Sequence, residues 1–326
     1  MESDPTRCQP EAAPSGVGAA RRAVVDIGTN SVKLLVADVH GSAVMPVLES
    51  SEQTRLGQAF YRTHRLTPAA INRTAVAVAR FAAQARALGA HDVRVIATSA
   101  ARDARNPDDL RAAVRQGCGL ELAVISGEQE AEWAFRGVTS DSRLGGRLLL
   151  ILDVGGGSTE VVLGHNSPPA FRQSYPLGAV RLLESVAPGE PPTVTDRARC
   201  EESVRSFLRD QVGPPLRAAL AAFAAPAELV GTGGTASVLG AMELGLIRFD
   251  RERLESLRLE RARVQHWLAH LWQLPLAERR RIPGLPPERA DVILTGVAIY
   301  AGLMECFDFP ALRISTRGLR FAALRD

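Results

Sequence analysis

The chain has 326 residues, of which 46% are hydrophobic and 23% are charged, and its formal net charge is +3. This length predicts about two domains of roughly 150 residues each. The longest strongly apolar run, 148–152, is far shorter than the roughly 20 residues of a membrane helix. The small net charge argues against general nucleic-acid binding. We therefore expect a globular cytoplasmic protein with neither membrane nor nucleic acid as a partner.

The N-terminal segment 1–20 mixes Pro, Ser, Gly and acidic residues without an apolar stretch. It is predicted to be a disordered tail rather than a secretory signal. The cysteines, Cys8, Cys118, Cys200 and Cys306, are far apart and form no C-x-x-C pair. A disulfide framework or a structural zinc site is therefore not expected, which agrees with a reducing cytoplasm.

Hydrophobic periodicity and turn residues divide the first half of the chain into short elements. In chain order we expect strands 23–26, 32–39 and 44–49, helix 67–88, strand 93–97, helix 107–115, strand 120–125 and helix 126–138. The polar, Gly-containing segment 139–146 is the predicted hinge. Residues 21–142 and 143–326 are thus the predicted domains.

After the hinge the opening pattern repeats. Residues 22–36 are R-A-V-V-D-I-G-T-N-S-V-K-L-L-V, and residues 149–163 are L-L-I-L-D-V-G-G-G-S-T-E-V-V-L. Both predict an apolar strand, an Asp-x-Gly-x-x-Ser turn and a second strand, with Asp26 equivalent to Asp153. Such a repeat predicts two similarly folded halves that face each other. The second half then continues as a mostly helical run over 195–307.

Each repeated turn places a carboxylate at the end of a buried strand, before residues with little side-chain bulk. Backbone N–H groups in such a turn can approach an anion closely, and the Ser hydroxyl adds a donor. A carboxylate cannot hold phosphate without a cation, so Asp26 and Asp153 imply a divalent metal with oxygen ligands. One copy would indicate only a tight turn, but two copies in register favour a phosphate site.

A third Gly-rich turn, V-G-T-G-G-T at 230–235, follows a predicted strand at 228–230 and precedes a helix that begins near Ala236. The N-terminus of such a helix attracts phosphate. The turn has neither the lysine of a Walker A loop nor the spacing of the dinucleotide fingerprint. Alone it is weak evidence for a binding site.

The segment 126–133, S-G-E-Q-E-A-E-W, opens a predicted helix. Glu128, Glu132 and Arg136 share one face at four-residue steps and are predicted to form a solvated charge ladder. Glu130 instead lies at the edge of the apolar face, where partial desolvation would make it more basic and suit a general base. The alternative is that these acids only interact favourably with the helix dipole.

Other candidate centres are less convincing. His266 and His270 are four residues apart, but Trp267 occupies the Glu position of the zinc-protease pattern. Ser158 lacks the G-x-S-x-G elbow of a nucleophile. Cys118 lies between glycines without a base nearby in sequence, so we expect a structural role for it.

Taken together, the motifs resemble the exopolyphosphatase / guanosine pentaphosphate phosphohydrolase (Ppx/GppA) phosphatase family. They occur in order from about residue 22 to 325: D-I-G-T-N-S at 26–31, T-R-L-G at 54–57, A-T-S-A-A-R at 97–102, S-G-E-Q-E at 126–130, D-V-G-G-G-S-T-E at 153–160, L-G-A-V-R at 177–181, G-T-G-G-T at 231–235 and S-T-R-G-L-R at 315–320. The resemblance implies an α/β fold of the actin–hexokinase–sugar-kinase superfamily. Two ribonuclease H-like domains, the second with a helical insertion, would enclose an active-site cleft.

The resemblance also implies roles by position. Glu130 matches the family's catalytic base, and Asp153 and Glu160 match the acidic residues tied to Mg²⁺, or Mn²⁺, and to the attacking water. The implied substrate-binding residues are Asp26, Gly28, Asn30, Ser31, Lys33, Arg102, Gly155, Gly156, Gly157, Ser158, Gly233, Gly234 and Thr235. For Lys33 a solvated surface position is an equal alternative, and Arg55 and Arg181 are the next candidates for phosphate contacts.

The implied activity is magnesium-dependent removal of terminal orthophosphate from inorganic polyphosphate by direct water attack, in a homodimer. The chain ends where longer members add a helical module, so short polyphosphates would be preferred. It has Phe321-Ala322 where members often continue Glu-Gly, which bears on the last helix rather than on the chemistry. Alternatives are conversion of guanosine pentaphosphate to the tetraphosphate in the stringent response, and a non-catalytic sensor of polyphosphate or alarmone. A kinase is disfavoured by the Glu130 motif.

Overall fold

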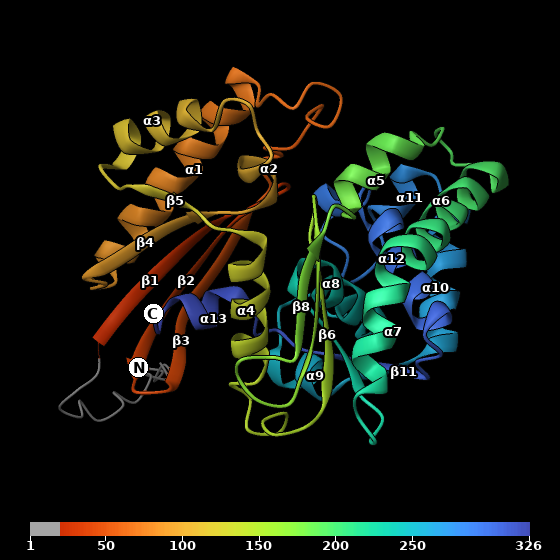
Figure 1. The fold of residues 1–326 in the computed structure, drawn as a ribbon. Coiled ribbons are helices and arrows are strands. Elements are labelled where there is room, and N and C mark those ends of the chain that lie inside the picture. The colour runs from red at the N-terminus through yellow and green to blue at the C-terminus, as the bar shows by residue number, and fades with distance from the viewer. Residues whose placement is uncertain (1–19) are drawn as a thin grey trace, which may run out of the picture.

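The structure, a computed structural model, describes residues 20–326, which form two lobes around two mixed β-sheets (Figure 1). The first sheet has the strand order β3-β2-β1-β4-β5, and the second has the order β10-β11-β9-β6-β7-β8. The predicted disordered tail, with Cys8, lies outside the described residues except for its last residue. Within 20–326, no helix is both long enough and apolar enough to cross a bilayer.

The first lobe contains every element that the sequence predicts for it, and one short helix, Ser99–Arg102, that it does not predict. These are β1 (Ala20–Ile27), β2 (Val32–His40), β3 (Ala43–Glu52), α1 (Pro68–Ala87), β4 (Asp92–Ala97), α2 (Ser99–Arg102), α3 (Pro107–Cys118), β5 (Leu122–Val124) and α4 (Gly127–Val138). Local capping explains the helix ends. The Thr67 side chain accepts a hydrogen bond from the Ala70 N–H at the start of α1, and Gly119 ends α3 in the left-handed conformation.

The second lobe is more elaborate than the sequence predicts. Its elements are β6 (Leu149–Val154), β7 (Thr159–Gly164), β8 (Phe171–Tyr175), α5 (Ala179–Val186), α6 (Val194–Phe207), the π-helix η1 (Leu208–Val212), α7 (Gly213–Ala221), β9 (Glu228–Thr232), α8 (Gly233–Leu244), α9 (Arg251–Ser256), β10 (Arg258–Glu260), α10 (Arg261–Gln273), α11 (Leu276–Arg279), the 3₁₀ helix η2 (Pro287–Arg289), α12 (Ile293–Cys306), β11 (Ala311–Ile314) and α13 (Leu319–Ala323). The short strands β8, β10 and β11 were not predicted, because three to five residues carry too little periodicity. Helix α8 begins at Gly233 rather than near Ala236, so residues 230–232 of the third Gly-rich turn end β9 and residues 233–235 form the first turn of the helix.

The predicted repeat is present in three dimensions. Strands β1 and β2 pair antiparallel with Asp26 opposite Lys33, and β6 and β7 pair in the same way with Asp153 opposite Glu160. The two turns are closed by the same bond, from Gly28 N to Ser31 O at 2.9 Å and from the equivalent Gly155 N to Ser158 O at 3.0 Å. The repeat therefore gives two turns with the same closing bond, and the residue paired with the aspartate is Lys33 in the first and Glu160 in the second.

Two helices join the lobes. Helix α4 lies between the two sheets in Figure 1: its Phe135 packs in an apolar cluster with strands of the second sheet, and its Trp133 packs in a cluster with the first. Helix α13 returns to the first lobe, where Phe321 joins the cluster that contains Val24 and Leu35. By its packing α13 thus belongs to the first lobe, although the sequence predicts it as part of the second domain. The boundary differs because buried apolar contacts, rather than chain order, decide where a terminal helix packs.

Candidate active site

The repeated turns face one another across a cavity of about 90 Å³ between the lobes. Nearly all the predicted site residues line it: Asp26, Gly28, Asn30, Ser31, Lys33, Glu130, Asp153, Gly155, Gly156, Gly157, Ser158, Glu160, Gly234 and Thr235. Gly233 lines an adjoining cavity, and Arg102 reaches the cavity wall through a bond to Glu130. The structure therefore brings together residues that are up to 209 positions apart, from Asp26 to Thr235.

Glycines allow the two lobes to approach this closely. A Cβ atom on Gly157 would lie 2.3 Å from the Tyr61 hydroxyl and 2.5 Å from Ser99 Oγ, both in the first lobe. A Cβ atom on Gly156 would lie 3.0 Å from Thr29 Cβ, also in the first lobe. These contacts explain why side-chain bulk is absent from the turns, independently of any ligand.

Glu130 has the environment of a general base. Its side chain is 6% exposed, and Arg102 Nη1 donates to its Oε2 atom at 2.9 Å. The pKa of Glu130 is raised to about 7: burial is the main cause, Arg102 opposes it, and the negative charges of Asp153 and Asp26 add to it. A carboxylate that titrates near neutral pH can both accept and release a proton during turnover.

The other cavity carboxylates are also destabilised as anions. Burial raises the pKa of Asp26, of Asp153 and, most strongly, of Glu160, which also lies near the charge of Glu130. Lys33 is one of the nearby cations: burial lowers its pKa, and the negative charge of Asp26 opposes this shift. The surface alternative for Lys33 is therefore wrong, because this side chain lies in the cavity wall opposite Asp26.

Two arginines of the site were not singled out from the sequence. Arg289 Nη2 donates to Ser31 Oγ at 3.4 Å, and burial lowers the pKa of Arg289. Arg320 donates to Leu34 O at 3.0 Å. Its positive charge lowers the pKa of Asp26 and so partly offsets the effect of burial. Arg320 belongs to a motif that carries the family resemblance, which could have identified it, whereas Arg289 follows a proline-rich loop without a motif.

Three hydroxyl groups of the first lobe were also missed. Thr29, Tyr61 and Ser99 converge on Gly157, and each has a buried oxygen without a hydrogen-bond partner among residues 20–326. Thr29 and Ser99 also line the cavity. A buried hydroxyl without a partner is unfavourable in a protein, so the hydroxyl groups of Thr29 and Ser99 are candidates to donate to a ligand's oxygen atoms.

One predicted surface feature is wrong. Glu128 is exposed. Glu132 Oε2 lies 3.6 Å from Arg172 Nη1, and Arg136 Nη2 lies 2.6 Å from Asp326 Oδ1. The expected charge ladder along α4 therefore does not form. The reason is that α4 is covered on two sides, and its charged residues meet partners from β8 and from the C-terminal segment. This leaves Glu130 as the buried acid of the helix.

Arg55 and Arg181 connect the lobes at the edge of the site. Arg55 Nη1 donates to Asp291 at 2.7 Å. Arg181 donates to Asp103 at 2.7 Å and to Gly157 O at 2.9 Å. Both guanidinium groups are thus engaged by protein partners of the opposite lobe or of the second turn, and they hold the cleft together.

The carboxylates of the cavity offer oxygen ligands to a divalent cation. Residues 20–326 contain no group of three or more His, Cys, Asp or Glu side chains arranged as a metal cage. Mg²⁺ is usually held by one or two carboxylates with substrate phosphates and water. Asp153 and Glu160 pair across β6 and β7, and burial raises the pKa of both. Asp26 Oδ1 is buried without a hydrogen-bond partner among residues 20–326, and its negative charge also raises the pKa of Asp153. A few buried carboxylates without a third protein ligand fit a Mg²⁺ ion that is bound together with phosphate, rather than a site made by the protein alone.

Comparison with known proteins decides the family. The model of the Ppx/GppA phosphatase family matches residues 35–324. The chain belongs to this family. It is 33% identical over 298 residues to "Exopolyphosphatase 2" of Mycobacterium tuberculosis, a match that covers 87% of this chain and 89% of that protein. It is 26% identical to the "Guanosine-5'-triphosphate,3'-diphosphate pyrophosphatase" of Vibrio atlanticus, with 91% of this chain and 57% of that protein covered.

The fold agrees with the family. The solved structure of the Aquifex aeolicus PPX-GPPA enzyme matches with a TM-score of 0.75 and 29% identity, and the match covers 94% of this chain and 99% of that one. The two-lobed α/β architecture of the actin–hexokinase–sugar-kinase superfamily is therefore the fold of this chain. As a Ppx/GppA family member it is a hydrolase of phosphoanhydride bonds.

Proposed function

We propose that the chain is a magnesium-dependent exopolyphosphatase that releases terminal orthophosphate from inorganic polyphosphate. The observation that carries the proposal is Glu130, a buried carboxylate with a pKa of about 7 in the wall of a small cavity between two phosphate-type turns. The relatives named exopolyphosphatase support it. At about 90 Å³ the central cavity is much smaller than the cavities of about 410 Å³ and about 610 Å³ with which it shares lining residues, which favours binding of the end of a chain there.

The residues of the cavity supply positioning and charge. Glu130 orients a water molecule and accepts its proton, while Arg102 holds the carboxylate in place through the 2.9 Å bond. The N–H groups of Gly28 and Gly155 close the turns, so the backbone N–H groups at 29–31 and 156–158 are those that would donate to the phosphoryl oxygens and stabilise the charge that develops on them. Ser158 lies in the second turn without the G-x-S-x-G elbow of a nucleophile, so direct water attack is the simplest route.

Asp153 and Glu160, with the phosphate oxygens, are the residues that would hold Mg²⁺. When bound, the ion neutralises charge on the phosphate oxygens and orients them for in-line displacement. The raised pKa values of both carboxyl groups, caused first by burial, indicate that a cation is needed to keep them charged together.

Hydrolysis of guanosine pentaphosphate is the second candidate. A cavity of about 410 Å³ adjoins the central one, and its lining includes the exposed aromatic ring of Phe249 together with Val238 and Pro286. An apolar wall of this kind can pack against a nucleobase. The 26% identical Vibrio relative bears the name of that activity.

The test is the initial rate of orthophosphate release from tripolyphosphate, long-chain polyphosphate and guanosine pentaphosphate, each with and without Mg²⁺. We expect release from polyphosphate that depends on Mg²⁺. Release from guanosine pentaphosphate alone would replace the first proposal with the second, and release from neither would leave a sensor role.

A further inference from the structure

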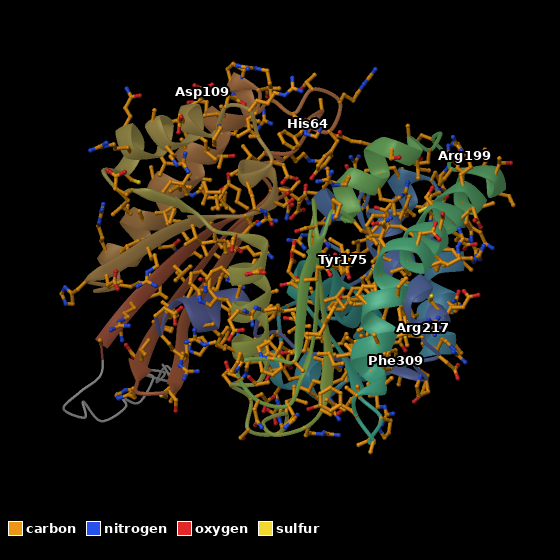
Figure 2. All side chains as sticks on the ribbon, in the orientation of Figure 1. His64, Asp109, Tyr175, Arg199, Arg217 and Phe309 are labelled. Atoms are coloured by element: carbon orange, nitrogen blue, oxygen red, sulfur yellow. The ribbon has the colours of Figure 1, made fainter. Side chains whose placement is uncertain are left out.

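The central cavity lies between two larger ones. It shares six lining residues with the 410 Å³ cavity, which we call the chain-side cavity: Asp26, Lys33, Asp153, Gly234, Arg289 and Leu319. It shares Ser99 and Ser158 with a cavity of about 610 Å³, which we call the base-side cavity. The base-side cavity is also lined by Tyr175, which is labelled in Figure 2 near the middle of the molecule. The reaction centre is thus a narrow space with an opening in two directions.

The position of the base distinguishes the two openings. Arg102 lines the base-side cavity and donates to Glu130, which lines the central cavity. In phosphoryl transfer the attacking and leaving oxygens are roughly in line, on opposite sides of the phosphorus. If Glu130 directs the water, the water stands towards the base-side cavity and the rest of the substrate extends into the chain-side cavity.

Both larger cavities have cationic side chains in their walls, and these differ in how closely acidic side chains pair with them. The chain-side cavity has Lys33, Arg289 and Arg320 in its wall. In the base-side cavity, Arg102 and Arg181 are held by short bonds to acids, whereas the ion-pair contact of Arg172 within residues 20–326 is a loose 3.6 Å to Glu132. Arg172 is exposed on β8, so its charge faces solvent at that opening.

We propose that orthophosphate leaves through the base-side cavity, past Arg172, while the shortened chain stays in the chain-side cavity. This inference rests on the proposed exopolyphosphatase function. Water adds its oxygen to the terminal phosphorus, and the bridging P–O bond breaks with its electron pair on the shortened chain. The proton of the water passes to Glu130. The product therefore forms on the side from which the water came, and the base-side cavity is an orthophosphate site.

Two charge-introducing variants separate the openings. Arg172→Glu changes the base-side cavity, and Ser51→Glu places a negative charge on exposed Ser51 in the lining of the chain-side cavity. Arg115→Glu, on a 71% exposed side chain of α3, is the matched control. The readouts are KM for long-chain polyphosphate and the inhibition constant of added orthophosphate, with melting curves to check folding.

We expect Arg172→Glu to raise the inhibition constant of orthophosphate by about threefold or more, because a repelled anion binds less tightly. Its KM for polyphosphate should match that of the control. Ser51→Glu should raise KM and leave the inhibition constant unchanged. The inference is overturned if Arg172→Glu raises KM and Ser51→Glu raises the inhibition constant, or if each variant raises both constants. It is also overturned if the inhibition constant of Arg172→Glu equals that of Arg115→Glu. Absence of phosphate release from polyphosphate by the unmodified protein would instead refute the proposed function, and the inference with it.

Discussion

The bond between Arg102 and Glu130 predicts how the activity depends on pH. Arg102 is the cation that opposes the effect of burial on the Glu130 pKa, which lies at about 7. A cation in direct contact lowers a carboxyl pKa by roughly 1–3 units. Arg102→Leu should therefore raise the pKa of Glu130 to between about 8 and about 10. At neutral pH the deprotonated fraction would fall from about a half to between about a tenth and about a thousandth.

The sign follows from the role of Glu130. A general base works only when deprotonated, so a higher pKa moves the acid limb of the activity profile to higher pH. The assay is kcat/KM for tripolyphosphate from about pH 5 to about pH 10, because this ratio reports groups of the free enzyme. Arg102→Lys retains a charge but loses the planar donor, and it should shift the limb less than Arg102→Leu. An acid limb that stays in place in both variants, with only KM raised, would refute this reasoning and leave Arg102 as a phosphate contact alone.

Other predictions concern packing and the metal. A Cβ on Gly137 of α4 would lie 2.1 Å from Gly318 O before α13, so Gly137→Ala should lower the free energy of unfolding by about 1–3 kcal/mol in urea titrations. Gly117→Ala on α3 meets no atom closer than 3.6 Å and should be neutral or slightly stabilising, and equal effects would contradict this account. Asp153→Asn and Glu160→Gln should each lower turnover and raise the Mg²⁺ concentration that half-saturates it. EDTA should abolish phosphate release by the native protein, and full activity in EDTA would remove the metal from the mechanism.

The parts of the site that the sequence predicted were those with a local pattern. The turns at 26–31 and 153–158 repeat one arrangement of strand, carboxylate and glycine, so their fold and their pairing across the cleft could be inferred before the structure. Glu130 could be separated from its neighbouring acids because helical spacing places it beside apolar residues, and it is buried as expected. Its role as a base stays a prediction.

The remaining parts depend on contacts between distant segments. Arg289 meets Ser31 across 258 positions, and no local pattern in a chain rich in arginine indicates such a contact. Tyr61 reaches Gly157 from a loop without periodicity. The packing of α13 on the first sheet likewise depends on which buried surface is available, and chain order gives no information about it.

The central claim, that Glu130 is the base in polyphosphate hydrolysis, is tested most directly by Glu130→Gln. The measurement is single-turnover release of orthophosphate from tripolyphosphate with Mg²⁺, together with the equilibrium binding of that substrate, and Glu128→Gln is the matched control on the exposed face of α4. The account predicts a rate lower by a factor of about 100 or more for Glu130→Gln, with binding retained and the control unaffected. Equal losses in the two variants, or a normal rate for Glu130→Gln, would contradict it.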